Sequence, residues 1–399
     1  MVLELNMVQT IALAVILLLL GEYLVKKIKF LSKYCIPAPV VGGLLFSILA
    51  LILRQNNIIE FTMDDTLQTL AMTMFFTSVG FSASFKLLKK GGIKVPLFLF
   101  VAVALVVLQN LLGIGIATLF NENPLLGIAT GSVPMTGGHG TAMAFGPDLE
   151  TAGFAGASTV AAAAATFGLV AGSMIGGPIG KRLIEKNNLL KKRDNLNTAD
   201  VEIDLLEEKG RKLVPNNFYI ATFEILIAMG IGTIISNLLE DNTGLSFPAY
   251  IGAMLAGAII RNISDVTKSY DTPMVEIDIL GGISLSLFLS MALMSLKLWE
   301  LAELAVPMIA ILLSQTILMF LFANLVTFNI MGRDYDAAIL AAGHCGFGLG
   351  ATANGIAVMD SVTETYGPSP TAFFILPLIG SLFIDFFNIG IITAFVNFF

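Results

Sequence analysis

Charged residues are scarce in this chain. Asp, Glu, Lys and Arg make up 13% of its 399 residues, about half their usual share in soluble globular proteins, whereas hydrophobic residues make up 56%. The mean hydropathy is correspondingly high, at +0.85. A soluble fold of this size could not cover so much apolar surface, because its own exterior must face water. The composition therefore excludes a soluble globular protein and predicts a polytopic membrane protein with a lipid-facing exterior.

Cysteine and histidine are scarcer still, with two residues of each. Cys35 and Cys345 give neither a disulfide framework nor a metal-binding spacing, and both are expected to be small packing residues. His139 and His344 have no HExxH motif or cysteine pattern that would favour a metal site. No nucleophile–base spacing appears either, so an intramembrane enzyme is the least favoured class. The first apolar stretch lacks the basic start and A-x-A exit of a cleavable signal peptide, and we expect it to be a span.

Long apolar runs are abundant, and about 20 apolar residues suffice to cross a bilayer core as a helix. We predict an all-α polytopic membrane protein with ten spans, near residues 7–25, 37–54, 66–86, 94–120, 152–180, 218–239, 245–261, 277–297, 303–330 and 370–397. Two further apolar stretches, 124–146 and 336–359, are too rich in Gly, Ser and Thr for ordinary spans. We interpret them as re-entrant hairpins.

The basic residues are distributed very unevenly around these spans. Of the 22 Lys and Arg residues, 20 fall in the segments that follow the odd-numbered spans, and only Arg54 and Lys297 fall on the other side. Because cytoplasmic loops carry the excess of Lys and Arg, this pattern predicts that both termini are periplasmic or extracellular. The long hydrophilic stretch 181–217 is then a cytoplasmic linker.

The second half repeats features of the first at offsets of 208 to 212 residues. The matches, in chain order, are Pro39 and Gly43 with Pro248 and Gly252, Phe76 and Ser78 with Phe288 and Ser290, Pro96 with Pro307, Gly131 and Gly138 with Gly343 and Gly350, and Gly172 and Ser173 with Gly380 and Ser381. Their shared order favours duplication over chance similarity. We predict an N-terminal repeat over 1–180 and a C-terminal repeat over 218–399. Five spans is an odd number, so the repeats would be inverted, as in secondary transporters that bind substrate at the repeat interface.

The tips of the two hairpins are the strongest candidates for a binding site. Irregular backbone at membrane depth is tolerated only where it is buried in protein or lines a watery cavity. A helix that restarts after each tip would point N–H groups at that cavity, which favours an anion, whereas tight packing of small residues is the alternative. The two tips are expected to approach each other in the middle of the membrane. The predicted substrate-binding residues are Thr136, Gly137, Gly138, His139, Gly140, Thr141, Gly348, Gly350, Ala351, Thr352, Asn354 and Asp385.

Polar side chains within the spans are further candidates. Asp385 lies mid-span with Asn388 on the same helix face, and an intramembrane carboxylate is costly unless it has a role. Asp385 could bind a substrate ammonium group or sodium, or it could form a structural hydrogen bond. The predicted sodium ligands are Thr77, Ser78, Ser290, Asp385 and Asn388. Hydrogen bonding between helices is expected for Gln109, Asn110, Gln315 and Asn324. For His139, a substrate hydrogen bond and simple packing both stay open.

Several of these segments also resemble the bacterial glutamate:sodium symporter family. The similar stretches are residues 137–141, 161–170, 284–289, 296–301, 335–338 and 343–352, of which the last, GHCGFGLGAT, is the most specific. The resemblance implies uptake of L-glutamate coupled to sodium across the bacterial inner membrane. It also implies two inverted five-helix repeats with re-entrant loops and a homodimer. A related fold in 2-hydroxycarboxylate transporters implies elevator-type movement. Sodium would be the co-transported ion, with no organic cofactor.

The sequence offers no deeply buried Arg for a substrate carboxylate. Anion binding would then depend on N–H groups, hydroxyls and bound sodium, which offsets the cost of desolvating the anion. A tenfold sodium gradient supplies about 1.4 kcal/mol per ion, and a 100 mV potential supplies about 2.3 kcal/mol per charge. One sodium per monoanionic glutamate would give only about tenfold accumulation, so we predict at least two. A transporter of another dicarboxylate or hydroxycarboxylate is the first alternative, and a channel is a distant second.

Overall fold

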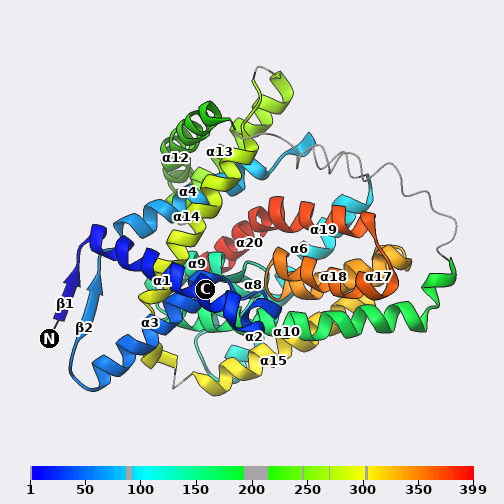
Figure 1. Ribbon diagram of the computed structural model, residues 1–399, viewed down its shortest axis with the longest axis horizontal. Helices are drawn as coiled ribbons and strands as arrows, with labels where there is room; N and C mark the ends of the chain where they lie inside the picture. Colours follow the sequence, from blue (N-terminus) through cyan, green and yellow to red (C-terminus); the bar gives the residue numbers. More distant parts are fainter. Residues whose placement is uncertain (1, 87–91, 193–213, 245–246, 269, 302–303) are drawn as a thin grey trace.

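The computed structural model describes residues 2–86, 92–192, 214–244, 247–268, 270–301 and 304–399, and almost all of them are helical (Figure 1). The first half contains β1 (Val2–Leu5), α1 (Met7–Lys27), α2 (Lys29–Lys33), α3 (Ala38–Gln55), β2 (Glu60–Met63), α4 (Thr66–Ser82), α6 (Lys94–Leu119), α7 (Pro124–Ala129), α8 (Ser132–Met135), α9 (Gly138–Thr151), α10 (Ala157–Lys186) and the 3-10 turn η1 (Leu189–Lys192). The two short strands pair in parallel, with Val2 opposite Glu60. This strand pair was not predicted.

The helices of the second half follow in a similar order, and its described residues contain no strand. It contains α12 (Pro215–Thr243), α13 (Ala249–Thr267), α14 (Met274–Met294), the 3-10 turn η2 (Leu298–Leu301), α15 (Ala305–Phe322), the π-helical turn η3 (Ala323–Thr327), α16 (Phe328–Ile330), α17 (Tyr335–Gly348), α18 (Thr352–Tyr366), α19 (Pro370–Leu382) and α20 (Ile384–Phe398). Each predicted span and hairpin therefore corresponds to a helix or a group of helices.

Within the described residues, seven helices are long and apolar enough to cross a membrane: α1, α3, α6, α10, α12, α14 and α15 with its continuation to Ile330. The bent pair α19–α20 makes an eighth. The remaining two of the ten predicted spans are α4, which has 17 residues, and α13, which carries Arg261 and Asp265. The chain is thus an all-α polytopic membrane protein.

Several predicted boundaries were wrong for identifiable reasons. The span near 152–180 continues to Lys186, because Lys181 and Glu185 are good helix formers that pair one turn apart at 4.0 Å. Only the ends of the predicted linker 181–217 are described, and both are largely helical; residues 193–213 lie outside the described part of the chain. The hairpins are longer than predicted and end at Thr151 and Tyr366.

The last predicted span, 370–397, is broken rather than continuous. Helices α19 and α20 meet at Phe383 with a bend of 42°. Pro377 removes one backbone hydrogen bond from α19, and a Gly–Ser pair directly precedes the bend, both of which are common causes of helix kinks. The break places the first turn of α20, which contains Asp385, directly after the bend.

The described helices pack in two groups that each draw on both halves (Figure 1). The six-helix group consists of α1, α3 and α4 with α12, α13 and α14. The hairpin group consists of α6 to α10 with α15 to α20. The two halves interlock within the hairpin group, since α10 packs against α17 and α18 of the other half. Gly168 of α10 faces the Leu349 carbonyl so closely that no side chain would fit there. The two groups meet where α4 and α14 contact α19, α20 and α9.

Candidate binding site between the two hairpins

A cavity of about 330 Å³ lies where the two hairpin tips meet the bend between α19 and α20. Its lining combines polar backbone from the hairpins with apolar side chains from the six-helix group. The lining residues are Cys35, Pro37, Phe75, Val79, Thr136, Gly137, Gly138, His139, Gly140, Thr141, Leu169, Leu285, Leu289, Ala351, Thr352, Ala353, Asn354, Gly380, Ser381 and Asp385. Ten of the twelve predicted substrate-binding residues line it; Gly348 and Gly350 do not.

The two hairpin tips touch each other. Gly138 has a φ of +63°, a backbone conformation that glycine adopts without strain, and this sharp turn lets α9 begin directly after α8. A Cβ atom on Gly138 would lie 2.7 Å from the carbonyl oxygen of Gly350. The expectation that the tips approach each other is therefore confirmed. Gly350 lies behind the cavity wall, where it supports the first tip.

Two helix N-termini open on this cavity. Helix α9 begins at Gly138 and helix α18 begins at Thr352, and neither has a side chain that caps its first turn. The first N–H groups of a helix have no partner within the helix, and they carry the positive end of its dipole. Because residues of both first turns line the cavity, these N–H groups lie at one site. Such an arrangement binds anionic groups without any basic side chain.

Among the described residues that line the cavity, Asp385 is the one acidic residue. Within the described part of the chain, its carboxylate forms no hydrogen bond or ion pair, so the alternative of a structural hydrogen bond has no support here. One turn further along α20, the side chain of Asn388 is fully buried. Its Nδ2 donates to the carbonyl of Ser132 at 3.2 Å, whereas its Oδ1 has no partner. A buried oxygen without a partner is costly, so it marks a place where a cation or water would fit.

His139 is held against α10. Its Nε2 lies 3.0 Å from the hydroxyl of Thr166, and that hydroxyl donates its hydrogen to the carbonyl of Ala162. The hydroxyl can therefore only accept from the ring, which places the proton on Nε2 and leaves Nδ1 as an acceptor. His139 thus packs on α10 and also lines the cavity, and its hydrogen bond to a substrate stays a prediction.

A buried network fixes the tips to the spans behind them. Gln109 on α6 accepts from Thr136 at 2.8 Å and donates to the carbonyl of Gly348 at 2.6 Å, so one side chain holds both hairpins. Gln315 on α15 donates to the backbone carbonyl of Gln109 at 2.7 Å. The Nδ2 of Asn110 donates to the hydroxyl of Ser132 at 2.8 Å, and its Oδ1 accepts from the N–H of Ser132 at 3.0 Å. The expected hydrogen bonding between segments is confirmed for these residues.

Asn324 does not follow this pattern, because its amide donates to Phe320 one turn earlier in its own helix. Asn354 lines the cavity, but its amide is occupied by protein. It donates to the carbonyls of Leu169 at 3.0 Å and Gly346 at 3.1 Å, and it accepts from Ser173 at 2.5 Å. Asn354 therefore attaches the second hairpin to α10 rather than presenting free polar groups to the cavity.

Of the five predicted sodium ligands, only Asp385 lines the cavity. Thr77 and Ser78 lie on α4 and donate their hydroxyl hydrogens to carbonyls of the same helix, at 2.6 and 2.7 Å. Ser78 also contacts α14 closely at Gly281. Ser290 on α14 is fully buried, and its hydroxyl has no partner. These three residues belong to the six-helix group.

The apolar side of the cavity was not predicted. Phe75 and Val79 of α4 and Leu285 and Leu289 of α14 face the hairpin tips. An apolar residue in an apolar helix gives no compositional signal of its own. The one available hint was that Leu285 and Leu289 lie in the stretch 284–289, which resembles the symporter family.

Comparison with known proteins agrees with this geometry. The family model described as sodium/glutamate symporter matches residues 3–368. The protein named sodium/glutamate symporter in Escherichia coli strain K12 is 42% identical over 398 residues, which cover 98% of each chain. Its namesake in Haemophilus influenzae is 40% identical over 388 residues, covering 97% of this chain and 96% of the relative. The chain therefore belongs to the sodium/glutamate symporter family.

Proposed function

We propose that this protein imports L-glutamate together with sodium across the bacterial inner membrane by alternating access. The observation that carries the proposal is the cavity at which two uncapped helix N-termini and one carboxylate converge. The names of the relatives support the choice of both substrate and ion. Sodium is cargo in this proposal, and no organic cofactor takes part. The protein acts as a carrier and not as an enzyme.

The cavity matches the charges of L-glutamate, which has two carboxylates and one ammonium group. The first turns of α9 and α18 would each receive a carboxylate through their N–H groups. Asp385 would receive the ammonium group through a charge-assisted hydrogen bond. Among the described lining residues none is Lys or Arg, so the anion depends on backbone groups. Substrate would touch residues 136–141, Ala351 and Thr352, with Gly348, Gly350 and Asn354 positioning them.

Sodium would bind beside the substrate, near Asp385 and Asn388. Hard cations take oxygen ligands, and the free Oδ1 of Asn388 and the carboxylate of Asp385 lie one turn apart on α20. A cation there would offset the cost of burying the substrate carboxylates. Thr77, Ser78 and Ser290 would form a second position on α4 and α14. At least two sodium ions per glutamate would allow accumulation well above tenfold.

The two helix groups suggest how access alternates. Each group takes its helices from corresponding places in the two halves, as expected of inverted repeats over residues 1–180 and 218–399 that are joined by a cytoplasmic linker. In an elevator-type cycle the hairpin group would carry the site past the six-helix group. Both termini would be outside the cytoplasm, and the protein would form a homodimer.

The test is uptake of labelled glutamate by the purified protein in liposomes. We expect saturable uptake that requires a sodium gradient and stops when the gradient is removed, with the glutamate recovered unchanged. Malate, citrate and aspartate are added as competitors. Stronger competition by a hydroxy acid would reassign the substrate, and flux that does not saturate would indicate a channel. A reversal potential consistent with one sodium per glutamate would refute the proposed stoichiometry.

A further inference from the structure

An apolar groove of about 570 Å³ separates α13 of the six-helix group from the bend between α19 and α20. It lies apart from the candidate binding site. The lining residues are Ala83, Phe85, Leu255, Ala258, Ile259, Asn262, Ile263, Val266, Thr267, Phe383, Phe386 and Phe387. Three of them, Phe383, Phe386 and Phe387, flank Asp385 in the chain.

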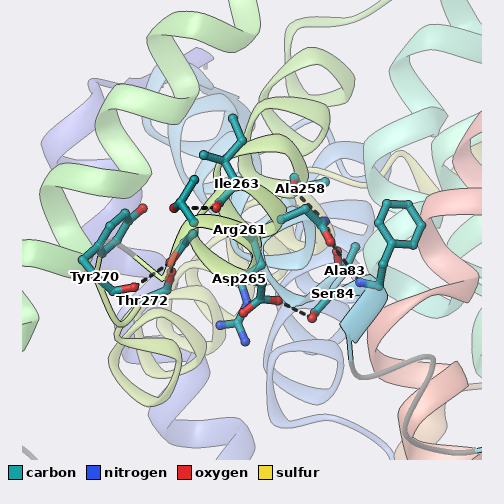
Figure 2. Close-up of polar contacts among 12 residues, drawn as sticks. Ala83, Ser84, Ala258, Arg261, Ile263, Asp265, Tyr270 and Thr272 are labelled. Atoms are coloured by element: carbon teal, nitrogen blue, oxygen red, sulfur yellow. Dashed lines mark hydrogen bonds and ion pairs between the residues drawn. The ribbon is translucent and has the colours of Figure 1, made fainter.

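One wall of the groove is fixed by polar contacts that leave its surface apolar (Figure 2). The amide of Asn262 donates to the carbonyl of Ala83 at 2.7 Å and accepts from the N–H of Phe85 at 3.0 Å. The hydroxyl of Ser84 donates to Asp265 at 2.5 Å, and Asp265 also pairs with Arg261 at 3.2 Å. The segment after α4 is thus attached to α13 through the carbonyl of Ala83, the N–H of Phe85 and the hydroxyl of Ser84. The surface that the groove offers to a ligand is therefore mostly apolar.

The exposed side chains of this groove require an apolar occupant. Phe85 is 63% exposed, Ile263 is 54% exposed and Val266 is 82% exposed. Water molecules are not stabilised in an apolar groove, because its walls offer them few hydrogen-bond partners. In a protein that spans a membrane, a groove on the outer face of a span meets lipid chains, and an acyl chain would supply the missing van der Waals contacts.

Positive charge lies at one end of the groove. Lys86 directly follows the lining residue Phe85, and Lys268 directly follows the lining residue Thr267. Both lysines are exposed, and neither forms an ion pair with any residue that the structure describes. Arg261 differs, since Asp265 neutralises it. Two uncompensated cations beside an apolar groove are complementary to a phospholipid with an anionic headgroup.

We propose that this groove binds one anionic phospholipid, with an acyl chain against Phe383, Phe386 and Phe387 and its headgroup at Lys86 and Lys268. The site is distinct from the glutamate cavity and does not depend on what the protein transports. The bound chain fills the gap between the two helix groups. It also packs on the outer side of the bend whose inner side presents Asp385.

Native mass spectrometry of the purified full chain tests this proposal. The protein is released from micelles containing equal amounts of phosphatidylglycerol and phosphatidylcholine, and bound lipids are counted. We expect one phosphatidylglycerol to be retained in preference to phosphatidylcholine. Ile263→Trp fills the groove and should abolish that retention. Ile234→Trp, which adds the same side chain to an exposed position of α12 outside the groove, should leave it unchanged.

The headgroup contact is tested separately with exposed lysines, whose substitution leaves packing intact. Lys86→Gln and Lys268→Gln should each weaken the preference for phosphatidylglycerol about fivefold, the equivalent of about 1 kcal/mol per basic side chain near an anionic lipid. Lys26→Gln, at an exposed lysine at the end of α1, is the matched control. Equal retention of the two lipids by the parent, or unchanged retention in Ile263→Trp, would show unspecific surrounding lipid only and overturn the proposal.

Discussion

The two hairpins have related glycine patterns but are built differently. The first consists of three helices, α7, α8 and α9, of 6, 4 and 14 residues, and its tip contributes six consecutive residues, 136–141, to the cavity. The second consists of two helices, α17 and α18, of 14 and 15 residues, and contributes four, 351–354. Its remaining surface packs against α10. The two hairpins thus occupy corresponding places in the two halves, whereas the first contributes more of the residues that line the cavity.

The two histidines also differ in their contribution to the cavity. His139 lies at the first tip and lines the cavity, whereas His344 is fully buried in the second hairpin. The Nδ1 of His344 lies 2.9 Å from the hydroxyl of Thr327, on the π-helical turn, and its ring packs with Phe98, Phe322 and Phe347. Similar Gly-His sequences therefore form part of a cavity wall in one hairpin and part of a packed core in the other.

The largest effect is expected at Asp385, which belongs to neither hairpin and faces both tips. Asp385→Asn keeps the shape and removes the charge, so a charge-assisted hydrogen bond worth roughly 1.5 to 3 kcal/mol is lost. We expect a roughly 10- to 100-fold lower apparent affinity for glutamate in sodium-driven uptake. Ser381→Ala, on the same cavity wall, is the control, with a much smaller change. Unaltered uptake by Asp385→Asn would mean that the cavity is not the substrate site.

The second test compares the tips directly through Gly138→Ala and Gly350→Ala. Alanine at Gly138 needs an unfavourable positive φ, which costs about 1 to 2 kcal/mol, and its Cβ would meet the Gly350 carbonyl. At Gly350 the φ is not positive, and the closest neighbour is the end of the Leu169 side chain, which can move. We expect Gly138→Ala to reduce uptake more strongly than Gly350→Ala at equal expression. The reverse order would show that the second hairpin forms the more demanding wall.

The third test separates the histidines. His344→Gln disturbs a buried hydrogen bond and a cluster of aromatic rings. We therefore expect the free energy of unfolding in detergent to fall by about 1 to 3 kcal/mol. The affinity of the folded fraction for glutamate should be nearly unchanged. His139→Gln should give the opposite result, a higher half-saturation concentration for glutamate at nearly normal stability. The contrast between the hairpins fails if both variants change the same property.

The sequence predicted the helices and the tips well, because apolar runs and glycine clusters are local signals. It did not predict the bend at Phe383, since residues 370–397 are apolar throughout and their hydrogen-bond pattern depends on neighbours. Hydrogen bonding was predicted for Gln109, but the identity of the partners of Gln109 and Asn354 could not be, because these include backbone carbonyls far away in the chain. The hydroxyls of Thr77 and Ser78 illustrate a further limit, since a helix can satisfy them locally and the sequence does not reveal it.

The smallest effect is expected at Ser290, which tests whether sodium binds outside the hairpin group. Its buried hydroxyl has no partner, so Ser290→Ala should leave stability unchanged or slightly higher. If Ser290 is a sodium ligand, its removal raises the sodium concentration needed for half-maximal uptake, while the response to glutamate at saturating sodium stays the same. Thr73→Ala is the control. Thr73 lies on α4, one turn before Thr77, and its hydroxyl donates to the carbonyl of Thr69. An unchanged sodium response would restrict the sodium site to the region of Asp385 and Asn388, on the side of the hairpins.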